Sequence, residues 1–376
     1  MSSRLAQVRH RLPTLVVIGV VALVTLGLPN FLSTPNVTIY VTVGLATMVA
    51  AGLSLLIGYA GQISLGQGAF YGIGAYSAAI MSLHGWPPWL ALGLAPLVSA
   101  AIAALLGVAL LRLEGHALAF GTLAIQLIFL SVLSETPSFS GGDIGLSAIP
   151  TLTLGPLSFA GDLSFARLVW VATIIILIIT RNLTKSRPGR GLRAMASGQD
   201  AASAAGVNVV GYKIREFALS AAYAGLAGAL YAFFIGYISP DAFPVMLSIE
   251  FVIMVVVGGL GTVSGAFVGA AVIIVLTQVL TTIGSNPSLP AQLPSVLSEG
   301  VYAIILILLL RLAPDGVVGL LSRLGRHVNL FHTAEARLPH SNTPDAPMQV
   351  TPGIAPSPLP TSTDANEALE PLSTDG

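Results

Sequence analysis

The sequence predicts an all-α fold, a polytopic transmembrane helical bundle of about ten spans with both termini in the cytoplasm. The chain is 54% apolar and only 9% charged, and its mean hydropathy is +0.86. Apolar runs of about 20 residues recur along it, which is the length that crosses a bilayer. The 16 lysines and arginines fall mostly between these runs, so charge and hydropathy divide the chain in the same way.

Ten apolar runs are interpreted as spans, at about 13–32, 36–57, 64–82, 88–111, 117–134, 165–181, 214–236, 245–260, 264–284 and 294–312. A polar segment rich in glycine and proline, 135–163, separates the fifth span from the sixth. The first run follows Arg4, Arg9 and Arg11, and no small-residue cleavage site comes soon after it. We therefore expect an uncleaved first helix rather than a signal peptide.

Positive charge sets the expected orientation. A cytoplasmic N-terminus and ten alternating spans place most of the positive residues inside: Arg112, the cluster at 181–215, Arg311, Arg323 and Arg326. Only Arg167 then lies outside, at a span end from which its side chain can snorkel to the interface. Because the opposite orientation would expose nearly every positive charge outside, we expect a multi-pass protein of the bacterial plasma (inner) membrane, surrounded by lipid.

Two regions differ in composition. Residues 1–326 are expected to form the transmembrane domain, and residues 327–376 a disordered cytoplasmic tail, rich in proline, serine and threonine, that is too polar to fold alone. The chain has no cysteine, its six histidines are scattered, and it lacks a GxxxxGK[ST] phosphate loop. Its formal net charge of zero disfavours nucleic acid as a partner. We therefore expect no catalytic residue, no metal site and no cofactor.

The densest positive cluster lies in an interior loop, about 182–213. Its alanine-rich part predicts a short helix that ends at Gly206, because alanine favours helix and glycine favours the position after it. A helix projecting into the cytoplasm is suited to dock on a partner; the alternative is a positive-inside loop with no partner. The candidate docking residues are Arg190, Gly191, Arg193, Asp200, Ala201, Ala202, Gly206 and Asn208.

Three glycine-rich segments, near 58–70, 140–146 and 258–265, interrupt or flank the apolar runs. Each is interpreted either as part of a translocation path or as close packing and tight turns. Gly261, Gly265 and Gly269 recur every four residues and are expected on one helix face. The candidates are Gly61, Gln62, Ser64, Gly66, Gly141, Gly142, Gly258, Gly259, Gly261, Thr262 and Gly265; Gln126, Glu250, Gln278 and Glu299 are further polar residues within apolar runs.

Five segments occur in a characteristic order: 58–76, the stretch from Leu111-Arg112-Leu113 to Ser140–Leu146, 187–231, 258–265, and Tyr302 with Ala313-Pro314-Asp315-Gly316. Through them, the chain resembles over about 36–320 the permease subunits of branched-chain amino acid ABC importers, specifically the M-type permease. The resemblance implies a second, related permease, two cytoplasmic ATPases and an extracytoplasmic solute-binding protein as partners. It also implies a transport subunit rather than an enzyme, with the segment 190–208 coupling it to the ATPases.

The chain departs from that pattern in three places. The coupling segment reads Ala196-Ser197-Gly198-Gln199-Asp200, with fewer charges than is usual; Asp143-Ile144 replaces a Pro-Asn or similar pair; and the tail beyond about 328 has no counterpart. Urea and short-chain amides therefore stay alternative substrates to branched-chain or other neutral amino acids. A standalone secondary transporter is a further alternative, and it would need membrane carboxylates, for which Glu250 and Glu299 are the candidates.

Overall fold

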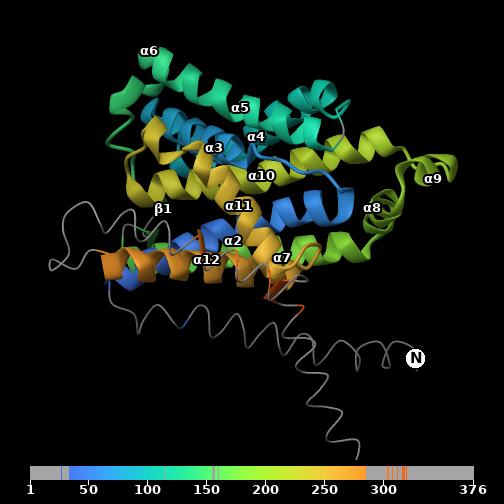
Figure 1. The fold of residues 1–376 in the computed structure, drawn as a ribbon. Helices are drawn as coiled ribbons and strands as arrows, with labels where there is room; N and C mark the ends of the chain where they lie inside the picture. The colour runs from blue at the N-terminus through green and yellow to red at the C-terminus, as the bar shows by residue number, and fades with distance from the viewer. Residues whose placement is uncertain are drawn as a thin grey trace, which may run out of the picture. The chain divides into compact units, whose positions relative to one another are not determined.

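The structure is a computed structural model that describes residues 27, 34–113, 115–154, 157–159 and 161–284, together with 303, 304, 307, 311, 316, 317 and 319. Over the described ranges the chain is almost entirely helical (Figure 1). The long helices are α2 Thr34–Ala60, α3 Gln67–Leu83, α4 Pro88–Leu110, α5 His116–Glu135, α7 Asp162–Lys185, α10 Val209–Ile235, α11 Val245–Gly258 and α12 Val263–Gly284.

Shorter elements connect them. After α5 come the single turn α6 Pro137–Ser140, the 3₁₀ turn η2 Gly142–Ile144, and a hairpin of strands β1 Thr153–Leu154 and β2 Leu157–Ser158. Between α7 and α10 lie α8 Arg187–Ser197 and α9 Gln199–Ala204, and η3 Pro240–Ala242 precedes α11. The expected all-α class is confirmed for the long elements, while the polar segment after α5 adds two antiparallel two-residue strands.

Seven described helices are long and apolar enough to cross a membrane. They correspond to seven of the ten predicted spans; another, expected at about 64–82, is the 17-residue helix α3. The tail, 327–376, lies outside the described residues, as do the first predicted span except residue 27 and the tenth except residues 303, 304, 307 and 311. A helix of 17 residues is about 26 Å long, shorter than a typical hydrocarbon core, and α3 is buried on most of its surface by neighbouring helices.

The centre of the bundle is α10, which packs against α2, α3 and α4. Glycines make this close approach feasible: a Cβ on Gly74 would overlap the backbone of Gly225, and one on Gly228 would overlap the Tyr71 carbonyl. Small residues allow helix backbones to approach in this way where lipid supplies no hydrophobic drive for association. The glycine content therefore reflects packing at these positions.

Turns that the alternation predicts on the same side of the membrane do contact one another. At one end, a Cβ on Gly58 would overlap Gly261, so the last turn of α2 meets the turn before α12. At the other end, Leu146 and Ile238 form an antiparallel bridge with N···O distances of 2.8 and 3.0 Å. These pairs come from segments far apart in sequence, and each joins two loops expected on one face.

Two predictions about local structure are wrong. The span expected from about 214 begins at Val209, so Lys213 belongs to the first turns of α10 rather than to a loop. Gly261 does not share a helix face with Gly265 and Gly269, because it lies in the turn before α12 with φ of +70°. A Cβ on Gly269 would overlap the Met254 carbonyl, so the last part of that pattern packs on α11 as predicted.

Candidate functional site

The first candidate site is the helical pair α8–α9, which Figure 1 shows at one end of the bundle, past the ends of α7 and α10. The Ser186 side chain caps α8 by accepting from the Gly189 backbone N–H at 3.5 Å, and Pro188 occupies its first turn, where its missing N–H costs nothing. The loop expected at about 182–213 is therefore mostly helical, and its two helices are separated at Gly198.

Apolar side chains anchor α8 to the bundle. Leu192 and Met195 are almost fully buried, and α8 packs against α2, α7 and α10. A Cβ on Gly189 would overlap the backbone of α7 near Thr184, and one on Gly191 would lie 3.2 Å from the Tyr212 ring. The opposite face carries exposed Arg190 and Arg193, so α8 is amphipathic and fixed in orientation.

The end of α9 matches the predicted glycine stop. Gly206 has φ of +82°, its N–H donates to the Ser203 carbonyl at 2.9 Å, and the Val207 N–H donates to the Ala202 carbonyl at 3.0 Å. This pair of bonds is a Schellman motif, which requires a left-handed residue where Gly206 stands. Asn208 then caps α10 by accepting from the Gly211 N–H at 2.9 Å.

The structure brings the eight predicted docking residues to this one end but divides their roles. Ala202 is buried and Gly191 packs on α10. Both residues therefore fix α8–α9 against the bundle and do not lie on its exposed surface. The other six are exposed: Arg190, Arg193, Asp200, Ala201, Gly206 and Asn208. The exposed face of α9 consists of small residues together with Asp200.

The second candidate site is the broken segment between α2 and α3. Gly61 has φ of +65°, and the Gln62 N–H donates to the Leu56 carbonyl at 3.0 Å. The Leu65 N–H donates to Thr122 Oγ1 at 2.9 Å, and a Cβ on Gly66 would lie 2.7 Å from the Thr122 carbonyl oxygen. Non-helical backbone of this kind is therefore held against α5, as membrane depth requires.

The 258–262 turn packs against the last turns of α2, which lead into this segment. Ser54 Oγ donates to the Thr262 carbonyl at 3.5 Å, and Thr262 Oγ1 donates to the Gly259 carbonyl at 2.8 Å. A Cβ on Gly265 would lie 2.8 Å from the Gly259 carbonyl oxygen. The predicted residues of 61–66 and of 258–265 therefore both lie next to the end of α2, one directly after it in sequence and the other packed on it.

A buried hydrogen-bond network extends from the broken segment. The Gly68 N–H donates to Ser248 Oγ at 2.8 Å, Ser248 Oγ donates to Gln126 Oε1 at 3.2 Å, and Gln126 Nε2 donates to the Phe243 carbonyl at 2.9 Å. The network joins α3, α5 and α11. Gln126 was recognisable as a polar residue in an apolar run, but nothing in the sequence marked Ser248.

Some polar atoms near this network have no hydrogen-bond partner among the described residues. Both amide atoms of Gln62, Oε1 of Gln67 and Oε1 of Glu216 are buried in this way. Gln67 Nε2 donates to Ser220 Oγ at 3.1 Å, and Ser220 is one helical turn beyond Glu216 on α10. A buried polar group without a partner costs about 1–3 kcal/mol, a cost that water bound at these atoms would offset. The sequence interpretation overlooked Glu216, although a carboxylate inside the predicted span 214–236 was a visible signal.

The third predicted segment forms a surface turn. Gly141 has φ of +76° and Gly142 φ of +60°, and the Ser140 hydroxyl accepts from the Gly142 N–H at 3.0 Å. Asp143 and Ile144 are exposed next to it. This turn lies away from α8–α9 and from the broken segment, because the Leu146 backbone pairs with Ile238 at the opposite end of the bundle. Among the described residues, no group of three or more histidine, aspartate or glutamate side chains is placed to hold a metal ion.

Comparison with known proteins identifies the family. Residues 36–310 match the family described as the permease component of branched-chain amino acid transport systems. The chain is 33% identical over 266 residues to the high-affinity branched-chain amino acid transport system permease protein LivM of Salmonella typhimurium and 32% identical to that of Escherichia coli; each alignment covers 64% of this chain and 61% of the relative. The chain thus spans about three-fifths of the length of these LivM proteins.

A second kind of relative aligns over more of its own length. The permease protein LivH of Salmonella typhimurium is 27% identical over 289 residues, which is 72% of this chain and 90% of the relative. No solved structure matches the chain. The family match and the seven candidate spans show a multi-pass inner-membrane protein. The chain belongs to the family of permease components of branched-chain amino acid transport systems.

Proposed function

We propose that this chain is the M-type permease subunit of an ATP-driven ABC importer for branched-chain or other neutral amino acids. The observation that carries the proposal is the family match over residues 36–310, which includes every described long helix except the first two residues of α2. The greater identity to LivM, 33% against 27% for LivH, supports the M-type assignment.

The proposed topology has ten spans and cytoplasmic termini. Seven candidate spans and α3 account for eight of them, and the apolar runs at about 13–32 and 294–312 supply the other two. In this arrangement α8–α9, Arg112 and the 58–61 and 258–262 turns lie on the cytoplasmic side. The contact between Gly58 and Gly261 supports it, since both turns are then on one face.

The exposed pair α8–α9 is the proposed coupling element. One of the two ATPases receives α9, which exposes Asp200 and Ala201 and is followed by the exposed Gly206; Arg190 and Arg193 on α8 flank it. Burial of Leu192 and Met195 connects this element to α2, α7 and α10, so that movement at the ATPase is transmitted to the bundle. The other partners are a second, related permease and an extracytoplasmic solute-binding protein.

The broken segment 61–66 and the 258–265 turn form a proposed inner gate. Their glycines permit close packing, while the unpartnered amide of Gln62 marks a polar point inside it. A gate that has two packing arrangements needs an element with low helix stability, which this glycine-rich segment provides.

Reconstitution in liposomes tests the proposed function. The chain is combined with its partner permease, ATPases and binding protein, and ATP hydrolysis and labelled leucine uptake are measured with urea and other amino acids as competitors. Leucine-dependent hydrolysis with uptake is the expected result. Stimulation of ATP hydrolysis by urea or an amide alone would show that one of these, and not an amino acid, is the substrate. If no solute stimulates ATP hydrolysis by the intact complex, the ABC assignment is contradicted in favour of a standalone carrier.

A further inference from the structure

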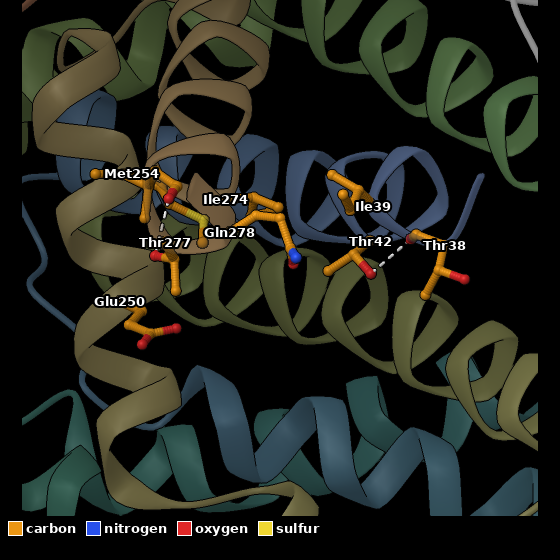
Figure 2. A pocket seen from close by; sticks show the side chains of 9 residues that line it. Thr38, Ile39, Thr42, Glu250, Met254, Ile274, Thr277 and Gln278 are labelled. Carbon is orange, nitrogen blue, oxygen red and sulfur yellow. Dashed lines mark hydrogen bonds between the residues drawn. The ribbon is translucent and has the colours of Figure 1, made fainter. Parts of the chain in front are cut away.

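A cavity of about 250 Å³ lies between α2, α11 and α12, away from both candidate sites described above (Figure 2). Its lining comprises Thr38, Ile39, Thr42, Glu250, Met254, Ile273, Ile274, Thr277 and Gln278. Glu250 and Met254 belong to α11, and the other lining residues belong to the beginning of α2 and the later part of α12. The Gly58–Gly261 contact lies at the other ends of α2 and α12. The cavity is therefore in the half of the bundle remote from α8–α9, which is the outer half in the proposed topology.

The polar lining is rich in hydrogen-bond acceptors. Glu250 is the one charged side chain among the nine described lining residues, and it is half-buried. Thr42 Oγ1 donates its proton to the Thr38 carbonyl and Thr277 Oγ1 to the Ile273 carbonyl, each at 2.9 Å, as the dashed lines in Figure 2 show. A hydroxyl whose proton is used within its own helix presents only lone pairs to the cavity. Thr38 and Gln278 can donate as well as accept, so it is the Glu250 carboxylate, with the lone pairs of Thr42 and Thr277, that favours a positively charged ligand which donates hydrogen bonds.

The remaining lining is aliphatic. Met254 and Ile273 are almost fully buried and form the base, and Ile39 and Ile274 are partly buried beside them. The cavity is slightly smaller than the roughly 300–1,000 Å³ of pockets that hold drug-sized ligands, which suits a small solute. One polar side and one aliphatic side fit a molecule with an ammonium group and a short branched chain.

The position of these polar groups also argues against a lipid-facing surface. Thr42, Thr277 and Gln278 are exposed on helices that qualify as membrane spans. Ionisable and polar groups at membrane depth normally face protein or a water-filled cavity, because hydrocarbon cannot solvate them. Glu250 beside these exposed polar groups therefore points to contact with water and solute.

We propose that this cavity is an outer binding subsite that recognises the ammonium group of a small aliphatic solute, with Glu250 as its counter-charge and the isoleucines against its side chain. The inference rests on the proposed function and narrows it, because an uncharged amide or urea lacks the positive charge that Glu250 pairs with. The permease itself would then select among solutes, in addition to the solute-binding protein.

Single-cysteine labelling tests this assignment, since the chain has no native cysteine. In the assembled complex without ATP, Gln278→Cys is treated with methanethiosulfonates that carry either an ethylammonium or an ethylsulfonate group; the thiolate forms a mixed disulfide and methanesulfinate leaves. Leu127→Cys on α5, whose native side chain is 53% exposed on a candidate span, is the control for a lipid-facing position. Two further variants are made in the Gln278→Cys background. Glu250→Gln removes the proposed counter-charge, and Glu135→Gln makes the same change at the exposed end of α5 as its control.

We expect Gln278→Cys to react with the cationic reagent about tenfold faster than with the anionic one, and Glu250→Gln but not Glu135→Gln to abolish that preference. Leucine and 3-methylbutylamine should slow the reaction, while 4-methylpentanoate should not. Reactivity no greater than that of Leu127→Cys, a preference unchanged by Glu250→Gln, or equal protection by 4-methylpentanoate would each overturn the proposal. So would a preference that is lost whenever ethanolamine lipids are present, because a lipid headgroup would then be the cation that occupies Glu250.

This measurement is separable from the test of transport. Labelling requires neither ATP hydrolysis nor uptake, so a complex that fails to import leucine but keeps the Glu250-dependent preference would contradict the proposed function alone. If the complex with native Glu250 imports leucine but shows no reagent preference, and Glu250→Gln leaves the KM for leucine unchanged, the subsite alone is contradicted.

Discussion

The close approach of α3 and α10 gives the sharpest test of the fold. Gly228 lies on α10 where a Cβ would be 2.7 Å from the Tyr71 carbonyl carbon and closer still to its oxygen, below the 3.0 Å that real Cβ atoms keep. The obstruction is backbone, which cannot turn away as a side chain can. Gly228→Ala must therefore separate the two helices or bend one of them.

The magnitude follows from two opposing terms. Overpacking a close contact costs about 1–3 kcal/mol, and a rigid backbone neighbour places this site at the upper end. Alanine regains about 0.5–1 kcal/mol relative to glycine inside a helix. We expect Gly228→Ala to lower the free energy of unfolding by about 2 kcal/mol.

A matched control separates the two terms. Gly93 lies inside α4, and no atom lies within 4 Å of the point where its Cβ would stand, so Gly93→Ala should gain the helix term alone, about 0.5–1 kcal/mol. Thermal unfolding of both variants in one detergent at one scan rate should give a lower midpoint for Gly228→Ala and an equal or higher one for Gly93→Ala. A Gly228→Ala midpoint equal to that of the native chain, with transport retained, would refute the close contact.

Three further changes have distinct expected results. Gln126→Leu should lower the free energy of unfolding by about 1–3 kcal/mol, seen as a lower thermal midpoint, because it removes the partners of Ser248 and the Phe243 carbonyl; an unchanged midpoint would contradict the network. Gln62→Leu should leave the midpoint equal or higher, since both amide atoms lack partners among the described residues; a lower midpoint would show a bonded amide. Removal of residues after about 330 should leave uptake unchanged, and lost uptake at normal membrane levels would show that the tail acts in transport.

The long helices were largely predictable because local signals define their ends. Pro87 and Pro88 start α4, and the left-handed Gly206 ends α9, each a position where backbone geometry favours that residue type. The start of α10 was misplaced because Lys213 was treated as a loop residue. Asn208 caps the helix ahead of it, and Lys213 is buried in the bundle, so tertiary packing includes this charge in α10.

Contacts between distant segments were not predictable from one sequence. Gly68 and Ser248 are 180 positions apart, and no periodicity or spacing relates them. The Glu250 cavity needs three helices to be placed before its lining can be assembled, although Glu250 and Gln278 were separately recognisable as polar residues in apolar runs. The hairpin of β1 and β2 is too short for an alternating pattern to appear.

The central claim is that α8–α9 couples the bundle to the ATPases. Gly206→Trp tests it against Gly236→Trp at the opposite end of α10, because both glycines have positive φ, +82° and +72°, and nothing within 4 Å of a Cβ. Both variants therefore bear a similar backbone strain of about 1–2 kcal/mol. We predict that ATPase co-purification falls at least about tenfold for Gly206→Trp and is retained for Gly236→Trp, with equal membrane levels. Full ATPase retention by Gly206→Trp would contradict the coupling role of α8–α9.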